Sequence, residues 1–156
     1  MKKQSKGVTV LEFALVLPLL FLLVFGIMEF GYLFFVQHTL EMATREGARL
    51  ALVGGTITEG GNQLNRVASV VATIRAKASI AVPPGDVEIS IYPVFPDSSY
   101  SDPVGWQTTQ NAGLSGSYMR VRTRYTHHFM TPVLGNFFTA GNMVVQAQAT
   151  YRNELF

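Results

Sequence analysis

The hydrophobic residues of this chain are concentrated near its N-terminus. From Val8 to Val36 the only charged residues are Glu12 and Glu29. A helix needs about 20 mostly apolar residues to cross a hydrocarbon core of roughly 30 Å. Residues 8–36 are therefore predicted to form a transmembrane helix.

The residues on either side of this helix predict its orientation. Lys2, Lys3 and Lys6 precede the apolar run without any acid, whereas the charges that follow it are mixed. An excess of lysine marks the cytoplasmic side of a membrane helix. Residues 1–7 are thus expected to be a basic cytoplasmic leader, with the C-terminal part on the other side. A cleaved signal peptide is the alternative, but this run is too long and no small-residue cleavage site closes it.

The pattern predicts that the first helix extends beyond the membrane and that a second helix follows it. Apolar residues keep helical spacing through 37–53, which predicts that the first helix continues beyond the membrane and ends before Gly54 and Gly55. After a glycine-rich turn, residues 63–80 have the pattern of a second, amphipathic helix. Pro83, Pro84 and Gly85 would stop it.

The C-terminal half alternates between apolar and polar residues in three segments: 86–94, 118–129 and 143–151. Such alternation predicts strands with one buried face, as in an antiparallel sheet. We expect an α+β fold in which the long and the short helix pack on a sheet of about three strands. Residues 54–156 form the expected outer domain, whose modest core would need the first helix for stability.

Composition excludes several classes of function. Without cysteine the chain has no disulfide and no thiolate metal site, and a net charge of +2 is too small to indicate nucleic acid as a partner. His127 and His128 are adjacent, so on a strand they would face opposite sides. No catalytic or phosphate-binding motif is present. We therefore expect no enzyme activity, cofactor, metal site or small-molecule substrate.

Glu12 is the candidate functional residue of the apolar helix. A carboxylate in the centre of a membrane costs about 2.5–3.5 kcal/mol even on lenient insertion scales, so such a residue is a functional-site hypothesis by default. The alternative is that Glu12 lies near the cytoplasmic interface and reaches water through its own flexible side chain.

Three blocks of sequence resemble the TadE-like family. They are LEFALVLPLL at 11–20, FGIMEFG at 25–31 and ATREGAR at 43–49. In addition, Gly7, four intervening residues and then Glu12 and Phe13 look like the processing site of type IV pilin-like proteins. The resemblance covers about residues 7–53, and the rest of the chain has no motif of this kind.

The resemblance implies a minor pseudopilin of the tight-adherence (Flp-type) pilus machinery in the bacterial inner membrane. A prepilin peptidase would cut between Gly7 and Val8, and Glu12 and Phe13 would serve assembly with other pilins, pseudopilins and pilus-assembly platform proteins. The freed amine of Val8 would lie one helical turn from Glu12, or near the Glu12 of a neighbouring subunit. The alternative is a permanently anchored periplasmic binding or scaffold domain that is neither processed nor assembled.

Other polar and small residues of the first helix are candidates for contacts. Glu29 lies 17 residues beyond Glu12, or about 25 Å along a helix, so we expect it near the opposite interface or in contact with a partner helix. Gly26 and Gly31 would permit close approach of a partner helix, although their spacing is not that of a GxxxG motif.

In the outer domain Trp106 and an arginine stripe are the candidate partner surface. Trp106 lies in the long loop 96–117 and would either anchor a partner or pack against the sheet. Arg120, Arg122 and Arg124 share one strand face, which would meet an acidic partner or lipid head groups, or would simply be solvated.

Overall fold

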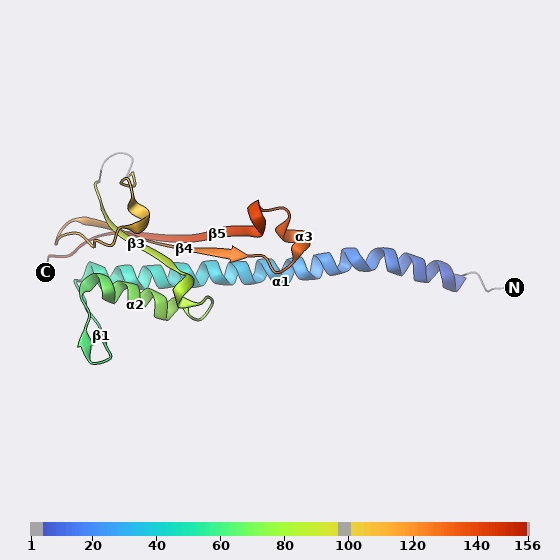
Figure 1. Cartoon of the computed structure of the whole chain (residues 1–156), viewed down its shortest axis with the longest axis horizontal. Coiled ribbons are helices and arrows are strands. Elements are labelled where there is room, and N and C mark those ends of the chain that lie inside the picture. The colour runs from blue at the N-terminus through green and yellow to red at the C-terminus, as the bar shows by residue number, and fades with distance from the viewer. Residues whose placement is uncertain (1–4, 97–100, 156) are drawn as a thin grey trace. The chain divides into compact units, whose positions relative to one another are not determined.

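The computed structural model describes residues 5–96 and 101–155 of the chain (Figure 1). Lys2, Lys3 and part of the long loop thus lie outside the described residues. The predicted α+β class is confirmed, with a long apolar helix, a second helix and small antiparallel sheets. The elements are α1 (Ser5–Leu52), β1 (Thr58–Glu59), β2 (Asn62–Gln63), α2 (Arg66–Ala78), β3 (Glu88–Val94), β4 (Tyr118–His128), α3 (Pro132–Gly135) and β5 (Asn142–Arg152).

The chain divides into two compact units, each of which is built from segments distant in sequence. Residues 1–34 and 128–143 form one unit, and residues 35–127 and 144–156 form the other. We refer to them as the apolar-helix unit and the sheet unit. The sequence prediction grouped all of 54–156 into one outer domain, whereas the structure assigns 128–143, between β4 and β5, to the apolar-helix unit.

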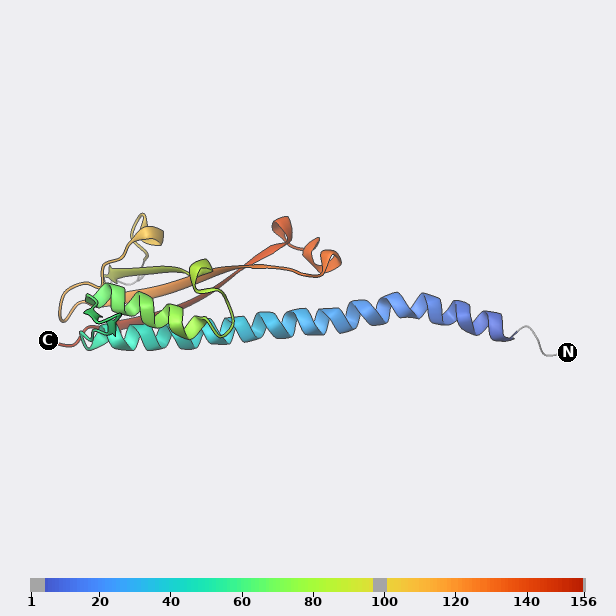
Figure 2. The same ribbon diagram turned by 60° about the horizontal axis from the view of Figure 1, so that its bottom comes forward.

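In the sheet unit the C-terminal half of α1 forms the centre of the core. Its fully buried side chains recur at helical spacing: Val36, Leu40, Ala43, Ala48 and Ala51. Helix α2 runs alongside this part of α1 (Figure 2). Gly47 makes that approach possible, because a Cβ at this position would lie 2.4 Å from Cγ1 of Ile74 on α2. This burial supports the expectation that the core depends on the first helix for stability, which stays a prediction.

The three-stranded sheet has the order β3-β4-β5, with β4 in the centre. β3 and β4 are antiparallel, and Ile91 lies opposite Val121. The β4 face that carries Val121 and Thr123 is buried and contacts α1, because the hydroxyls of Thr123 and Thr44 lie 2.7 Å apart. The sheet thus covers α1 with the face that alternation predicts to be buried.

The segment between α1 and α2 holds an element that the sequence pattern did not predict. β1 and β2 form a two-residue antiparallel hairpin around Gly60 and Gly61, whose φ angles of 57° and 83° lie in the left-handed region. Asn65 then caps α2 by accepting a hydrogen bond from the backbone N–H of Ala68 (2.8 Å). The cap explains why α2 begins at Arg66, three residues after the predicted start.

The apolar-helix unit joins the first part of α1 to the 128–143 segment, which contains α3 and a 3₁₀ turn at Thr139–Gly141. The ring of Phe30 meets that of Phe129 edge-on at 6.4 Å, and Phe129 stacks on Phe138 at 4.3 Å. The backbone N–H of Phe129 donates to the carbonyl of Gly141 (3.1 Å), which closes the segment at its base.

Candidate membrane and assembly segment

The first part of α1 is a helix whose apolar side chains are exposed. α1 is long and apolar enough to cross a membrane, by length and composition. Leu15 and Leu19 are 78 % and 68 % exposed, and large apolar side chains are exposed over most of the stretch from Val8 to Met28. Such a continuous apolar surface indicates a membrane or a protein partner.

The predicted processing and assembly residues lie in the first turns of this helix. Gly7, Val8, Glu12 and Phe13 are all exposed and helical. Val8 and Glu12 are four residues apart and therefore lie on the same side of the helix. The Gly7–Val8 bond lies close to Ser5, the first described residue of α1.

Glu29 is in a different environment, because its side chain is only 3 % exposed. The backbone N–H of Met130 donates to one carboxylate oxygen (3.0 Å). The backbone N–H and the hydroxyl of Thr131 donate to the other oxygen, at 3.2 and 3.1 Å. Sequence reasoning expected an interface or a partner helix for Glu29 and missed this contact within the chain.

Gly26 and Gly31 leave open space on α1. A Cβ added at either position would meet nothing within 4 Å. Their backbone is therefore accessible to a closely packed helix. Contact with a partner helix stays a prediction for both glycines.

Comparison with known proteins identifies the N-terminal segment. Residues 7–49 match a family model described as TadE-like protein. This part of the chain is similar to TadE-like proteins. The suspected resemblance is thereby confirmed over the segment that contains Gly7, Glu12, Gly26, Glu29 and Gly31. No curated protein and no solved structure matches the chain.

Outside the TadE-like segment, Trp106 packs on the sheet of its own chain. Its ring lies 5.6 Å from that of Tyr92 on β3, and the guanidinium groups of Arg122 and Arg124 lie 4.2 and 5.1 Å from its centre. Of the two alternatives left open by the sequence, the structure has Trp106 against the sheet. The ring and the arginines make cation–π contacts.

The arginine stripe is covered rather than solvated. The side chains of Arg120 and Arg122 are only 11 % and 14 % exposed, and both pair with Asp102. Arg124 pairs across the strands with Glu88 at 2.7 Å. The expectation of a solvated face fails because the segment around Asp102 and Trp106 folds back over it.

The pKa values in this cluster reflect the competition between burial and charge. Burial by itself raises the pKa of Asp102, but hydrogen bonds from Tyr92 and Arg120 and the charges of Arg122 and Arg120 outweigh it and lower that pKa. Burial and the hydrogen bond to Asp102 raise the pKa of Tyr92 to about 12. Asp102 is therefore an anion that neutralises two arginines, and Tyr92 is its neutral donor (2.8 Å).

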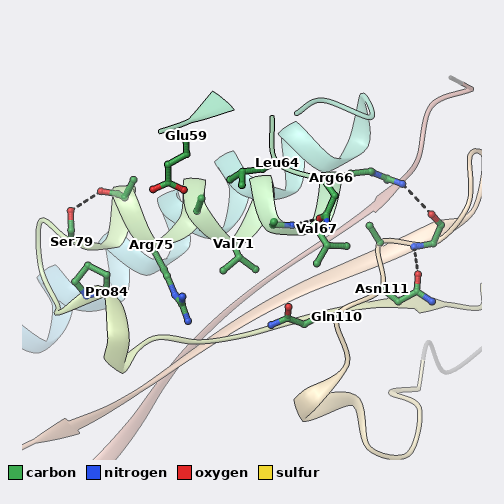
Figure 3. Close-up of a pocket in the computed structure, with 16 residues that line it drawn as sticks. Glu59, Leu64, Arg66, Val67, Val71, Arg75, Ser79, Pro84, Gln110 and Asn111 are labelled. Atoms are coloured by element: carbon green, nitrogen blue, oxygen red, sulfur yellow. Dashed lines mark hydrogen bonds between the residues drawn. The ribbon is translucent and has the colours of Figure 1, made fainter. Parts of the chain in front are cut away.

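A groove of about 1070 Å³ lies between α2 and residues 110–113 (Figure 3). Val67 and Val71 supply apolar side chains and Arg75 a cation. Arg66 at one end donates hydrogen bonds to the carbonyls of Ala51 (2.9 Å) and Gly113 (3.0 Å), and burial lowers its pKa. Arg66 thus ties α1, α2 and the loop together at this end of the groove.

The sequence offered partial signals for the residues that it missed. An acid within a few residues of Trp106 could have been matched to the arginine stripe, which needs neutralisation when covered. No local pattern marked Tyr92 as the partner of Asp102. His127 is buried and His128 exposed, so these neighbours face opposite sides of β4, as alternation predicts.

Proposed function

We propose that this chain is a minor pseudopilin that supports assembly of a tight-adherence (Flp-type) pilus or a related secretion apparatus in the bacterial inner membrane. The TadE-like segment indicates involvement with this machinery. The observation that carries the proposal is Glu12, an exposed carboxylate on the apolar part of α1, followed by Phe13 and placed five residues after Gly7.

In this proposal a prepilin peptidase hydrolyses the Gly7–Val8 bond at the cytoplasmic face, leaving a carboxylate on Gly7 and an amine on Val8. The new ammonium group lies one turn from Glu12 of the same helix, or meets Glu12 of the next subunit. Pairing with an ammonium offsets the cost of an isolated carboxylate in an apolar environment. Such pairing would set the register between neighbouring helices.

The partners follow from this mechanism. The apolar face of α1 contacts lipid and the helices of other pilins or pseudopilins, with Gly26 and Gly31 as points of close approach. The N-terminus lies in the cytoplasm and the sheet unit in the periplasm, where it contacts the platform and pilus subunits. The side chains of Arg120 and Arg122 serve the sheet unit itself, which leaves the TadE-like helix as the main assembly surface.

The decisive test is the N-terminus of the membrane-extracted protein. The full chain is produced in cells with and without a matching prepilin peptidase, and its intact mass and N-terminal sequence are determined. We expect a chain that begins at Val8 only when the peptidase is present. A chain that keeps residues 1–7 in the presence of an active peptidase would support the permanently anchored scaffold instead. Loss of the whole apolar stretch would indicate a cleaved signal peptide.

A second test separates membrane insertion from assembly. Glu12→Ala should leave membrane insertion intact and abolish incorporation into the pilus machinery, measured by co-purification with the other pilus subunits and by pilus yield. Glu12→Asp, which keeps the carboxylate at this position, is the matched control and should still assemble. Unchanged pilus output from Glu12→Ala would refute the role of the carboxylate.

A further inference from the structure

The segment Phe129–Gly141, which we call the hairpin tip, exposes an apolar surface of its own. From Tyr125 to Tyr151 the sequence contains no Asp, Glu, Lys or Arg. Within the tip, Met130, Val133 and Phe137 are 74 %, 53 % and 80 % exposed. Exposed apolar side chains clustered on a short, uncharged segment indicate a contact surface rather than a water-facing turn.

Glu29 fixes the tip to one level of α1. Its carboxylate accepts three hydrogen bonds from Met130 and Thr131, and Phe30 packs edge-on against Phe129. All these residues belong to the apolar-helix unit. The axial position of the tip is therefore the axial position of Glu29.

Glu29, and with it the tip, lies at the C-terminal end of the uncharged stretch of α1 that begins after Glu12. No charged residue stands between Glu12 and Glu29, and the two are about 25 Å apart along the helix axis, against roughly 30 Å for a hydrocarbon core. Ile27 and Met28, each 66 % exposed, bring the apolar surface of α1 up to the tip. The exposed surface of the tip thus lies at the axial level that the exposed apolar side chains of α1 reach.

Many backbone N–H groups of the tip already donate hydrogen bonds, which suits a poorly hydrated environment. Hydrogen bonds within the segment occupy the N–H groups of Phe129, Gly135, Asn136, Phe137, Phe138 and Gly141. Glu29 accepts from the two N–H groups that precede Pro132. A segment that leaves bulk water needs these backbone hydrogen bonds, because unpaired N–H and C=O groups are costly in lipid.

We propose that the hairpin tip inserts into the outer interfacial layer of the bilayer beside α1 and forms a second, non-spanning membrane contact. The proposal rests on the membrane anchoring in the proposed function, but not on processing or assembly. Lipid is the occupant because the tip is uncharged, exposes apolar side chains and is held by Glu29 at the level where the uncharged stretch after Glu12 ends. The exposed polar side chains Asn136 and Thr139 suit the interface rather than the hydrocarbon centre.

The absence of cysteine allows a direct test with single labels. Val133→Cys and Phe137→Cys are made in the full chain, labelled with an environment-sensitive fluorophore and reconstituted into phosphatidylcholine–phosphatidylglycerol vesicles. Leu19→Cys reports on the span, and Glu59→Cys, on the exposed β1, is the water-facing control. Quenching is measured with lipids that carry a shallow or a deep spin label, and with aqueous iodide. Circular dichroism verifies that each variant is folded.

We expect the tip labels to shift to shorter emission wavelength and to lose most of their intensity with the shallow quencher, and less with the deep one. Leu19→Cys should respond mainly to the deep quencher and Glu59→Cys only to iodide. Tip labels that behave like Glu59→Cys, or that resist every quencher as in a protein interface, would overturn the inference. If Leu19→Cys also fails to respond, the anchoring itself is wrong. Lipid-quenched tip labels on a chain that is never processed would refute the pseudopilin role alone.

Discussion

The hydroxyl groups of Thr44 on α1 and Thr123 on β4 lie 2.7 Å apart, and both side chains are fully buried. Thr44 has a single hydroxyl proton, which it donates to the carbonyl of Leu40 at 2.6 Å. Thr123 must therefore be the donor to Thr44. This directed pair connects the central strand of the sheet to the helix that carries the TadE-like segment.

Replacing Thr44 by valine should destabilise the sheet unit by about 1–3 kcal/mol, because the buried hydroxyl of Thr123 loses this acceptor. Thr44→Ser keeps the acceptor and is the matched control. The double variant Thr44→Val/Thr123→Val removes donor and acceptor together and should cost less than the single Thr44→Val change. Urea unfolding in detergent micelles, followed through the fluorescence of Trp106, measures all three. Equal stability of Thr44→Val and Thr44→Ser would show that the pair does not matter.

Gly47→Ala should also destabilise the sheet unit, although alanine favours helices. The new Cβ would lie 2.4 Å from Cγ1 of Ile74, and overpacking of this kind costs typically 1–3 kcal/mol. The gain in helix propensity is about 1 kcal/mol, so a net loss of up to about 2 kcal/mol is expected.

The contact with Ile74 is tested by a double-mutant cycle. In an Ile74→Ala background the clash is gone, and Gly47→Ala should then become neutral or stabilising. The same urea midpoints provide the readout. If Gly47→Ala has the same effect in both backgrounds, the two side chains do not compete for space.

The elements that were predicted well are those with a strong local period. The first helix was expected over 8–53 and runs from Ser5 to Leu52, and the three strands lie within two residues of their predicted bounds. In each case one face alternates or repeats over many residues, and the burial of that face decides the structure. The hairpin β1–β2 has only two residues in each strand, which is too short for any period to be seen.

The contacts that were missed join residues far apart in sequence. Glu29 and Thr131 are separated by 102 positions, and nothing in either local pattern marks them as partners. Likewise, alternation correctly put the three arginines on one face but could not reveal that the Trp106 segment covers it. Periodicity shows which residues share a face of a helix or strand, but it does not show which segment of the chain packs on that face.

The stability of the sheet unit should depend on pH through Asp102. Its pKa is lowered in the folded state, so the stability it contributes is present above its ordinary pKa of 3.8 and is lost as the pH falls further. Asp102→Asn should remove this acid-dependent part and lower stability at neutral pH, because two arginines lose their anion. Thermal unfolding temperatures measured from pH 7 down to below pH 3.8 give the pH dependence of stability for both proteins. An acid limb that is unchanged in Asp102→Asn would contradict the assignment.

The stability of the sheet unit at alkaline pH should depend on Tyr92. Its pKa is raised from 10.0 to about 12, so its contribution is complete below pH 10 and is lost as the pH rises from there toward 12. Tyr92→Phe has no proton to lose and should flatten this alkaline loss. Tyr118→Phe, on the adjacent strand, is the matched control and should retain it. An identical alkaline profile for Tyr92→Phe and the unsubstituted chain would show that another group is responsible.

Removing the carboxylate of Glu29 should release the hairpin tip without unfolding the sheet unit. In Glu29→Ala the N–H groups of Met130 and Thr131 lose their acceptor, and hydrogen bonds to charged groups contribute about 1.5–3 kcal/mol each. Hydrogen exchange of the peptide that spans Met130 and Thr131, measured in nanodiscs, should therefore accelerate strongly. Glu29→Gln keeps one acceptor oxygen and should give an intermediate rate, and Glu12→Ala should leave the rate unchanged. Slow exchange that persists in Glu29→Ala would mean that packing around Phe129, rather than the carboxylate, holds the tip on α1.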